Sequence, residues 1–186
     1  MALIAVGFRL HTGWAAMVAV SADCKVYLRR RVELIDDSVP RFMYHAAAEM
    51  PVADAERLID SARELAFACA QRAVADAIQH LRAANLRVVA CGVSVGSSKL
   101  PADLSAILRS HALIHAAEGV LFQTSVIAAA EQQGLSVTPV REKGLWAGAD
   151  PKLRERIEKM RSEFGPPWTL EQKIATAVAL AALKNK

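Results

Sequence analysis

The sequence has few aromatic side chains and few cysteines. Aromatic residues make up 5% of the chain and hydrophobic residues 53%, so the core must be built from Ala, Val, Leu and Ile, which favours close packing of helices on a sheet. The three cysteines, Cys24, Cys69 and Cys91, form no Cys-x-x-Cys pair and have no His spacing that matches a zinc finger. We therefore expect reduced, buried thiols and a cytoplasmic location.

A long uninterrupted apolar run is also absent from the N-terminal region. Arg9 and His11 interrupt the apolar stretch at residues 2–22 before it reaches the ~20 residues that a membrane span requires. A secretory signal would begin with positive charge, whereas residues 2–8 are apolar. We expect two strands here and no membrane partner.

Motifs for common cofactors are missing as well. The stretch GVSVGSSK at residues 92–99 lacks the Gly-Lys-Ser/Thr ending of a phosphate-binding loop. Neither a dinucleotide fingerprint nor a Ser/His/Asp order is visible, and the sequence predicts no cofactor. A net charge of +4 permits a polyanionic partner but falls short of the dense basic stripe of a dedicated nucleic-acid binder.

What is present is a regular order of strands and helices. Strands are predicted at residues 2–10, 13–22, 25–35, 86–96 and 135–142, and helices at 52–84, 101–133 with a break at Gly119, 152–164 and 169–184. The order is β-β-β-α-β-α-β-α, with three antiparallel strands followed by two that are reached through helical crossovers. We expect an α/β fold in one domain over residues 1–186, with a helical tail at about 151–186.

This order is the one found in ribonuclease H-like folds, and three segments add to the likeness. Residues 4–17 resemble the first hairpin of RuvC-type Holliday-junction resolvases and their YqgF-type relatives, in which an Asp-x-Gly step precedes Thr-Gly and a second apolar strand. Residues 115–145 and 166–183 are similar to the later helix-strand segment and to the closing helix of that family. The resemblance implies a five-stranded mixed sheet with helices on both faces.

The carboxylates of that family are not in their places. Its members cut phosphodiesters with two metal ions that three or four carboxylates hold. The corresponding positions here are Ala5, the region around Cys91 and Gly92, and Gln172 and Lys173 on the closing helix, with Glu171 as the one survivor. One carboxylate cannot hold two metal ions, so we carry over the fold and expect no metal-dependent nuclease.

The polar end of the first hairpin is the leading candidate site. Arg9 and His11 alternate along the strand and should share a face, where a guanidinium can bind phosphate and an imidazole can carry a proton. An alternative is a water-exposed hairpin end without function.

Arg141 and Lys173 are further candidates to line the same cleft, together with Tyr44, His45, Glu142, Lys143, Trp168 and Gln172. The first hypothesis is a RuvC-like protein that binds nucleic acid or another anionic ligand.

A second constellation lies on the helix of residues 101–133. His111, His115 and Glu118 are spaced i, i+4 and i+7, which places them on one face. They are weak candidates for a metal site in an enzyme that acts on a small molecule, with Arg9 or His11 needed to complete the cluster. The alternative is a structural His–Glu hydrogen bond. A third hypothesis is an assembly protein, for example a homodimer, that pairs through the Ala-rich final helix or an edge strand.

Overall fold

The computed structural model describes residues 2–146 and 151–185, and its centre is one five-stranded sheet. The strands are β1 (Ala2–His11), β2 (Trp14–Ser21), β3 (Val26–Glu33), β4 (Leu86–Val95) and β5 (Ser136–Arg141), in the spatial order β3-β2-β1-β4-β5. β1, β2 and β3 pair antiparallel, whereas β1–β4 and β4–β5 are parallel. The predicted mixed sheet is confirmed, and the N-terminal apolar run forms its first hairpin.

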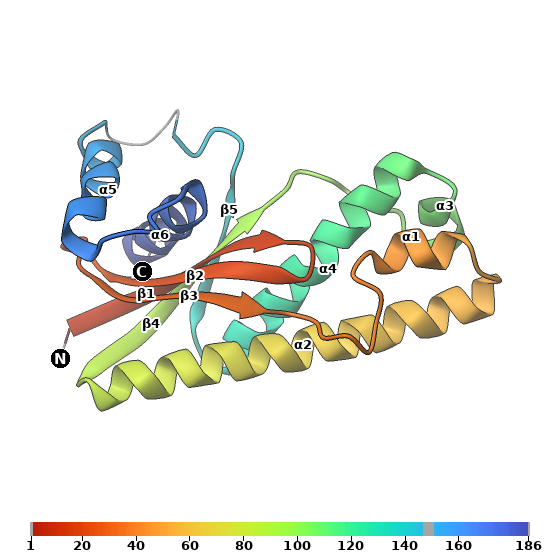
Figure 1. Ribbon diagram of the computed structural model, residues 1–186, viewed down its shortest axis with the longest axis horizontal. Helices are drawn as coiled ribbons and strands as arrows, with labels where there is room; N and C mark the ends of the chain where they lie inside the picture. The colour runs from red at the N-terminus through yellow and green to blue at the C-terminus, as the bar shows by residue number, and fades with distance from the viewer. Residues whose placement is uncertain (1, 147–150, 186) are drawn as a thin grey trace.

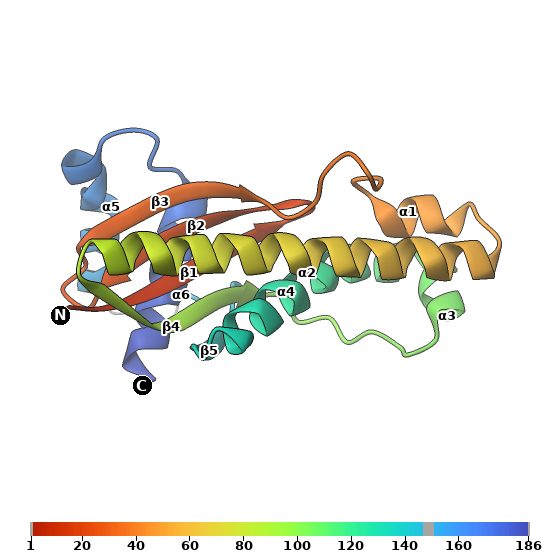
Figure 2. The same cartoon turned by 90° about the horizontal axis from the view of Figure 1, so that it is seen from below.

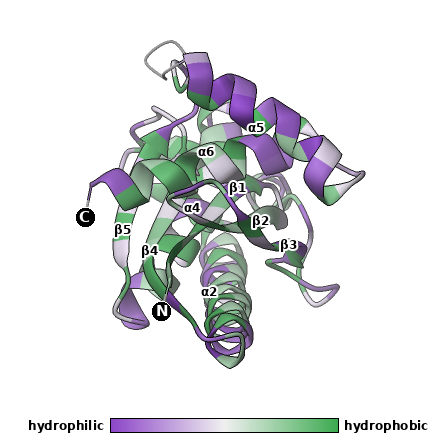
Figure 3. Ribbon diagram, turned by 90° about the vertical axis from the view of Figure 1, so that its left-hand side faces the viewer, coloured by the Kyte–Doolittle hydropathy of each residue, from purple (hydrophilic) through white to green (hydrophobic). Residues whose placement is uncertain are grey.

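Helices cover both faces of the sheet, as predicted. On one face lie α2 (Val52–Ala83) and α4 (His111–Gln132), and on the other lie α6 (Leu170–Lys184) and, outside it, α5 (Pro151–Phe164) (Figures 1 and 2). The outer side of α5 is hydrophilic, while α6 beneath it is largely apolar (Figure 3). The segment expected as a tail therefore supplies one whole layer of the fold.

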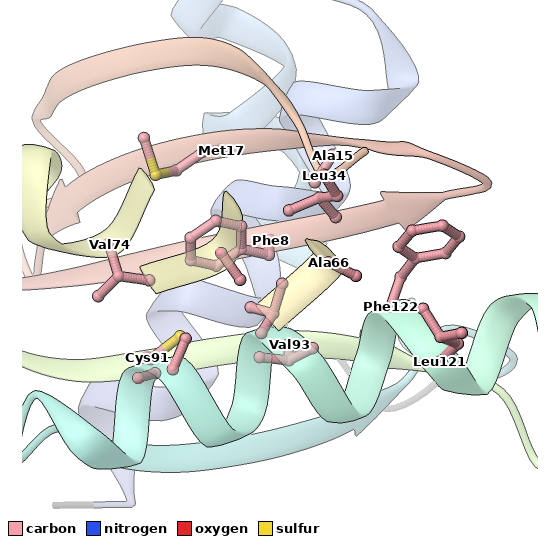
Figure 4. Packing of buried hydrophobic residues seen from close by; sticks show 14 of the residues in the cluster. Phe8, Ala15, Met17, Leu34, Ala66, Val74, Cys91, Val93, Leu121 and Phe122 are labelled. Carbon is pink, nitrogen blue, oxygen red and sulfur yellow. The ribbon is translucent and has the colours of Figure 1, made fainter. Parts of the chain in front are cut away.

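The core between the sheet and α2 and α4 contains most of the large apolar side chains. Phe8 of β1, Val93 of β4 and Phe122 of α4 are fully buried there, and Figure 4 shows them packed beside Met17 and Leu34. The three cysteines are free and buried, as predicted. Burial raises the pKa of the Cys91 thiol, which lies in this core.

The second core is thinner, because α6 lies almost directly on the sheet. Gly7 and Gly92 are neighbours on β1 and β4. A Cβ on Gly7 would come within 2.8 Å of Ala179 Cβ, and one on Gly92 within 2.8 Å of the Ala179 nitrogen, with backbone carbonyls of α6 closer still. Both positions therefore require glycine for close approach of the helix.

Two details of the predicted helices are wrong. The break in the region 101–133 is not at Gly119, which lies inside a continuous α4; it separates α3 (Leu104–Leu108) from α4. The Ser110 side chain caps α4 by accepting a hydrogen bond from the Leu113 N–H. A short helix, α1 (Met43–Ala48), also lies in a region where the sequence predicted no helix or strand.

Among the described residues, α4 is the one helix that is long and apolar enough to cross a membrane by length and composition. It packs against α2, β4 and β5 and supplies Leu121, Phe122 and Val126 to the core. We interpret α4 as a core helix, because a buried helix in a layered fold has the same composition.

Candidate functional site

Arg9 lies at the centre of an ion-pair network at the end of β1. Its Nη2 donates to Glu142 Oε1 at 2.7 Å and its Nε donates to Glu142 Oε2 at 3.3 Å. Its Nη1 donates to Glu171 Oε2. Glu142 follows β5 and Glu171 lies in the first turn of α6, so one guanidinium joins three elements of the fold.

The local sequence explains why these groups meet. Alternate residues of β1 face α6: Ala5 belongs to the second core, Gly7 contacts α6, and Arg9 follows on the same side. α6 begins with a reciprocal capping box between Thr169 and Gln172, which fixes the first turn. Glu171 is thereby held beside the end of β1.

His11 extends the network toward the β1–β2 hairpin. Its Nε2 contacts Glu171 Oε2, and its ring stacks on Trp14 with centroids 4.3 Å apart. The Arg31 guanidinium of β3 lies 3.8 Å from the centre of the Trp14 ring in a cation–π contact. Trp14 therefore lies in a polar row that runs from β1 to β3.

The pKa values of Arg9 and Glu171 are set by their opposite charges and by burial. Burial lowers the pKa of Arg9, but hydrogen bonds and charge from Glu142 and Glu171 more than offset it, so its pKa is raised. Burial likewise raises the pKa of Glu171, and hydrogen bonds from His11 and Arg9 outweigh it, so that pKa is lowered. Both residues stay ionised at neutral pH.

Deeper along β1 and β4, the positions next to α6 are Ala and Gly, without polar side chains. Ala5 lies opposite Ala90, and Gly7 lies opposite Gly92. Cys91, which the sequence placed near a lost carboxylate, points to the other face of the sheet, into the core with α2 and α4. The polar groups of this site therefore begin only at Arg9.

The remaining candidates for the cleft do not take part in the ion pairs of Arg9. Arg141 is exposed at the end of β5, and Lys143 is exposed just beyond it. Lys173 pairs with Glu158 of α5. Trp168 donates its indole N–H to the Ile157 carbonyl at 2.7 Å, so it holds α5 on the fold.

The histidine constellation on α4 does not join Arg9 or His11. His111 and His115 lie near the start of α4, with their Nε2 atoms 2.9 Å apart. Glu118 accepts its hydrogen bonds from α1, including one from His45 Nδ1 at 3.3 Å. His45 completes this cluster; the sequence named it only among cleft residues, because a contact between residues 45 and 118 leaves no local pattern.

No protein-family model matches the chain, and no curated protein matches it by sequence. Among solved structures, Thermus thermophilus RuvC in complex with Holliday junction substrate aligns with a TM-score of 0.58 at 15% identity, over 96% of this chain and 90% of the other. The fold is RuvC-like. A second Thermus thermophilus RuvC structure aligns with a TM-score of 0.53 at 13% identity, over 95% and 91% of the two chains. At these identities the RuvC-like likeness establishes the fold, as the sequence predicted.

Proposed function

We propose that this RuvC-like chain binds structured nucleic acid at the end of β1 without cutting it. The observation that carries the proposal is Arg9, whose guanidinium pairs with Glu142 and Glu171 at the edge where the sequence resemblance places the resolvase site. Arg9 thereby offsets one of the two negative charges that would repel a phosphate backbone there.

The residues next to α6 do not fit a pair of divalent cations. Such ions need several anionic oxygen ligands, whereas the neighbouring positions on β1 and β4 are Ala5, Gly7, Ala90 and Gly92. The two nearby carboxylates are both bonded to Arg9. This edge of the sheet therefore lacks the set of ligands that two-metal hydrolysis needs.

Exposed cations beside the network would supply the phosphate contacts. Arg141 and Lys143 flank Glu142 and are exposed, and exposed Arg41 donates to the Thr12 carbonyl at the hairpin. In this proposal Arg9 is a positioning residue: its bond to Glu142 holds the segment that carries Arg141 and Lys143. A cytoplasmic location and a single domain over residues 1–186 belong to the same proposal.

The test is fluorescence anisotropy with a labelled four-way DNA junction and a duplex of equal length, at about 50 to 200 mM salt. We expect the junction affinity to fall steeply as salt rises, because bound phosphates release counterions. Gels run with Mg²⁺ or Mn²⁺ should show intact DNA. A dissociation constant that does not change with salt, or junction cleavage, contradicts the proposal.

Variants that remove exposed positive charges identify the surface that binds DNA. Replacing Arg141 and Lys143 together by Gln should reduce the salt slope by about two phosphate contacts. Arg63→Gln, which removes an exposed charge from α2 on the opposite face of the sheet, is the matched control and should leave the slope unchanged. Equal losses of salt slope in Arg63→Gln and in the Arg141→Gln/Lys143→Gln variant would indicate that DNA binds elsewhere on the molecule.

A further inference from the structure

Three histidines from two helices meet at the end of the molecule where α1, α3 and the first turns of α4 and α2 gather (Figures 1 and 2). One potential ligand nitrogen from each of His45, His111 and His115 lies within 4.8 Å of the other two. The ring centroid of His45 is 5.6 Å from that of His111 and 4.7 Å from that of His115. His111 and His115 are exposed and His45 is half-buried, so the cluster is open to solvent.

Two of these nitrogens already converge. The Nε2 atoms of His111 and His115 are 2.9 Å apart. Two imidazole lone pairs at this distance repel unless a proton or another cation lies between them. The i, i+4 spacing on a helix produces this geometry directly.

Glu118 provides an independent observation beneath the cluster. Its side chain is 3% exposed, and Oε1 accepts from the Tyr44 N–H at 2.8 Å and the His45 N–H at 3.4 Å. Its Oε2 is buried and has no hydrogen-bond partner among the described residues. A buried carboxylate of this kind gains from positive charge nearby.

Glu118 also determines how His45 can bind a ligand. His45 Nδ1 lies 3.3 Å from Glu118 Oε1, so a proton on Nδ1 would be donated to the carboxylate. That tautomer leaves the Nε2 lone pair of His45 free to bind a metal ion. A carboxylate that orients a ligating imidazole in this way is the usual outer partner of a metal-bound histidine.

We propose that His45, His111 and His115 bind one divalent transition-metal ion of the Zn²⁺ class, with Glu118 as the carboxylate that orients His45. Three imidazoles suit zinc and its neighbours rather than Mg²⁺ or Ca²⁺, which prefer oxygen ligands. Tetrahedral zinc with bonds of about 2.1 Å separates its ligand atoms by roughly 3.4 Å. The side chains therefore need only small rotations, and a fourth position stays open for water or a ligand.

The proposal does not depend on nucleic-acid binding, and it is tested on the untagged full chain after treatment with a chelator. We expect Co²⁺ to produce the visible absorption of a low-symmetry site, saturating at one ion per chain, and Zn²⁺ to displace it. His111→Ala and His115→Ala should each weaken binding on the order of 100-fold or more, and Glu118→Gln about 10- to 100-fold.

His80→Ala is the matched control, because His80 is an exposed histidine on α2 outside the cluster. It should bind Co²⁺ as the unchanged chain does.

Zn²⁺ should also raise the Tm of the unchanged chain and of His80→Ala, because the ion joins α1 to α4, and it should not raise that of His111→Ala. Absence of saturable binding, or equal binding by a His111→Ala/His115→Ala double variant, overturns the proposal. Both exposed residues can be replaced without disturbing the core, so a folding defect does not obscure the result.

Discussion

Arg9 is the residue that distinguishes the end of β1. Its guanidinium satisfies two carboxylates from distant parts of the chain, Glu142 and Glu171. The paired hydrogen bonds to Glu142 fix its orientation as well as its charge. Lysine, which has no planar fork of donors, could not replace it without loss.

The lowered pKa of Glu171 predicts a particular dependence of stability on pH. Its ordinary value is 4.5. Because the folded-state pKa is lower, the network stabilises the fold above pH 4.5 and this contribution is lost as pH falls through the folded value. Glu171→Gln should therefore be about 1–2 kcal/mol less stable at pH 7, and the difference should shrink in acid.

Urea unfolding between pH 7 and pH 3 measures this effect. Glu163→Gln, on the exposed surface of α5, provides a carboxylate-to-amide control and should track the unchanged chain at neutral pH. A deficit for Glu171→Gln that stays constant down to pH 3 would show that its ionisation is not the source.

At the scale of elements, α6 lies so close to β1 and β4 that a Cβ at Gly7 or Gly92 would clash with the α6 backbone. Gly92→Ala would push a methyl group against the α6 backbone and should destabilise the protein by about 3 kcal/mol or more. Gly119→Ala is the matched control, because a Cβ there meets only the end of Gln123 at 3.8 Å. Since α4 is helical at this position, that change should stabilise it by about 0.5–1 kcal/mol. Thermal unfolding of the Gly92→Ala and Gly119→Ala variants measures this difference. Equal Tm values would contradict the close approach of α6 to β4.

The strong periodicities of the sequence predicted the long elements. Runs of Val, Ile and small residues predicted β1 and β2, alternation predicted β3, and the continuous apolar run of residues 86–96 predicted a central strand. The break at Gly119 was misplaced because a helix tolerates an unobstructed glycine, whereas the Ser110 cap ends one segment and starts another. α1 has six residues and no side-chain cap, so no local signal marks it.

The candidate sites were less predictable than the fold. The shared face of Arg9 and His11 follows from strand alternation, and the sequence named Glu142 and Glu171 without pairing them with Arg9. Those pairs join residues separated by more than 130 positions, and only the tertiary fold brings them together. The tertiary fold likewise brings together His45 and Glu118, which are 73 positions apart.

Considered as a whole, the molecule carries two polar sites on different sides of its sheet. The Arg9 network faces α6, whereas the histidine cluster lies with α1 and α4 on the side of α2 (Figures 1 and 2). Sites without shared partners usually act additively. Homodimer formation, for which β3 and β5 offer the sheet edges, stays a prediction that sedimentation velocity tests.

Additivity predicts that the two proposed ligands bind independently. Zn²⁺ should change the affinity for the DNA junction by less than about twofold, and the Arg141→Gln/Lys143→Gln variant should bind Co²⁺ within about twofold of the unchanged chain. Anisotropy and absorption titrations on the same protein measure both. A larger effect in either direction would require a coupled conformational change between the sheet and α1.

The paired glycines under α6 also limit where carboxylates for a two-metal site could be introduced. Carboxylates introduced at Gly7 or Gly92 would have no room unless the whole helix moved away. A redesign would have to start further along the strands, at Arg9 and at Ser94, whose hydroxyl accepts from the Leu10 N–H at 3.3 Å. A set of carboxylates for two metal ions at this edge would therefore require several simultaneous changes, including one that breaks the present ion pairs.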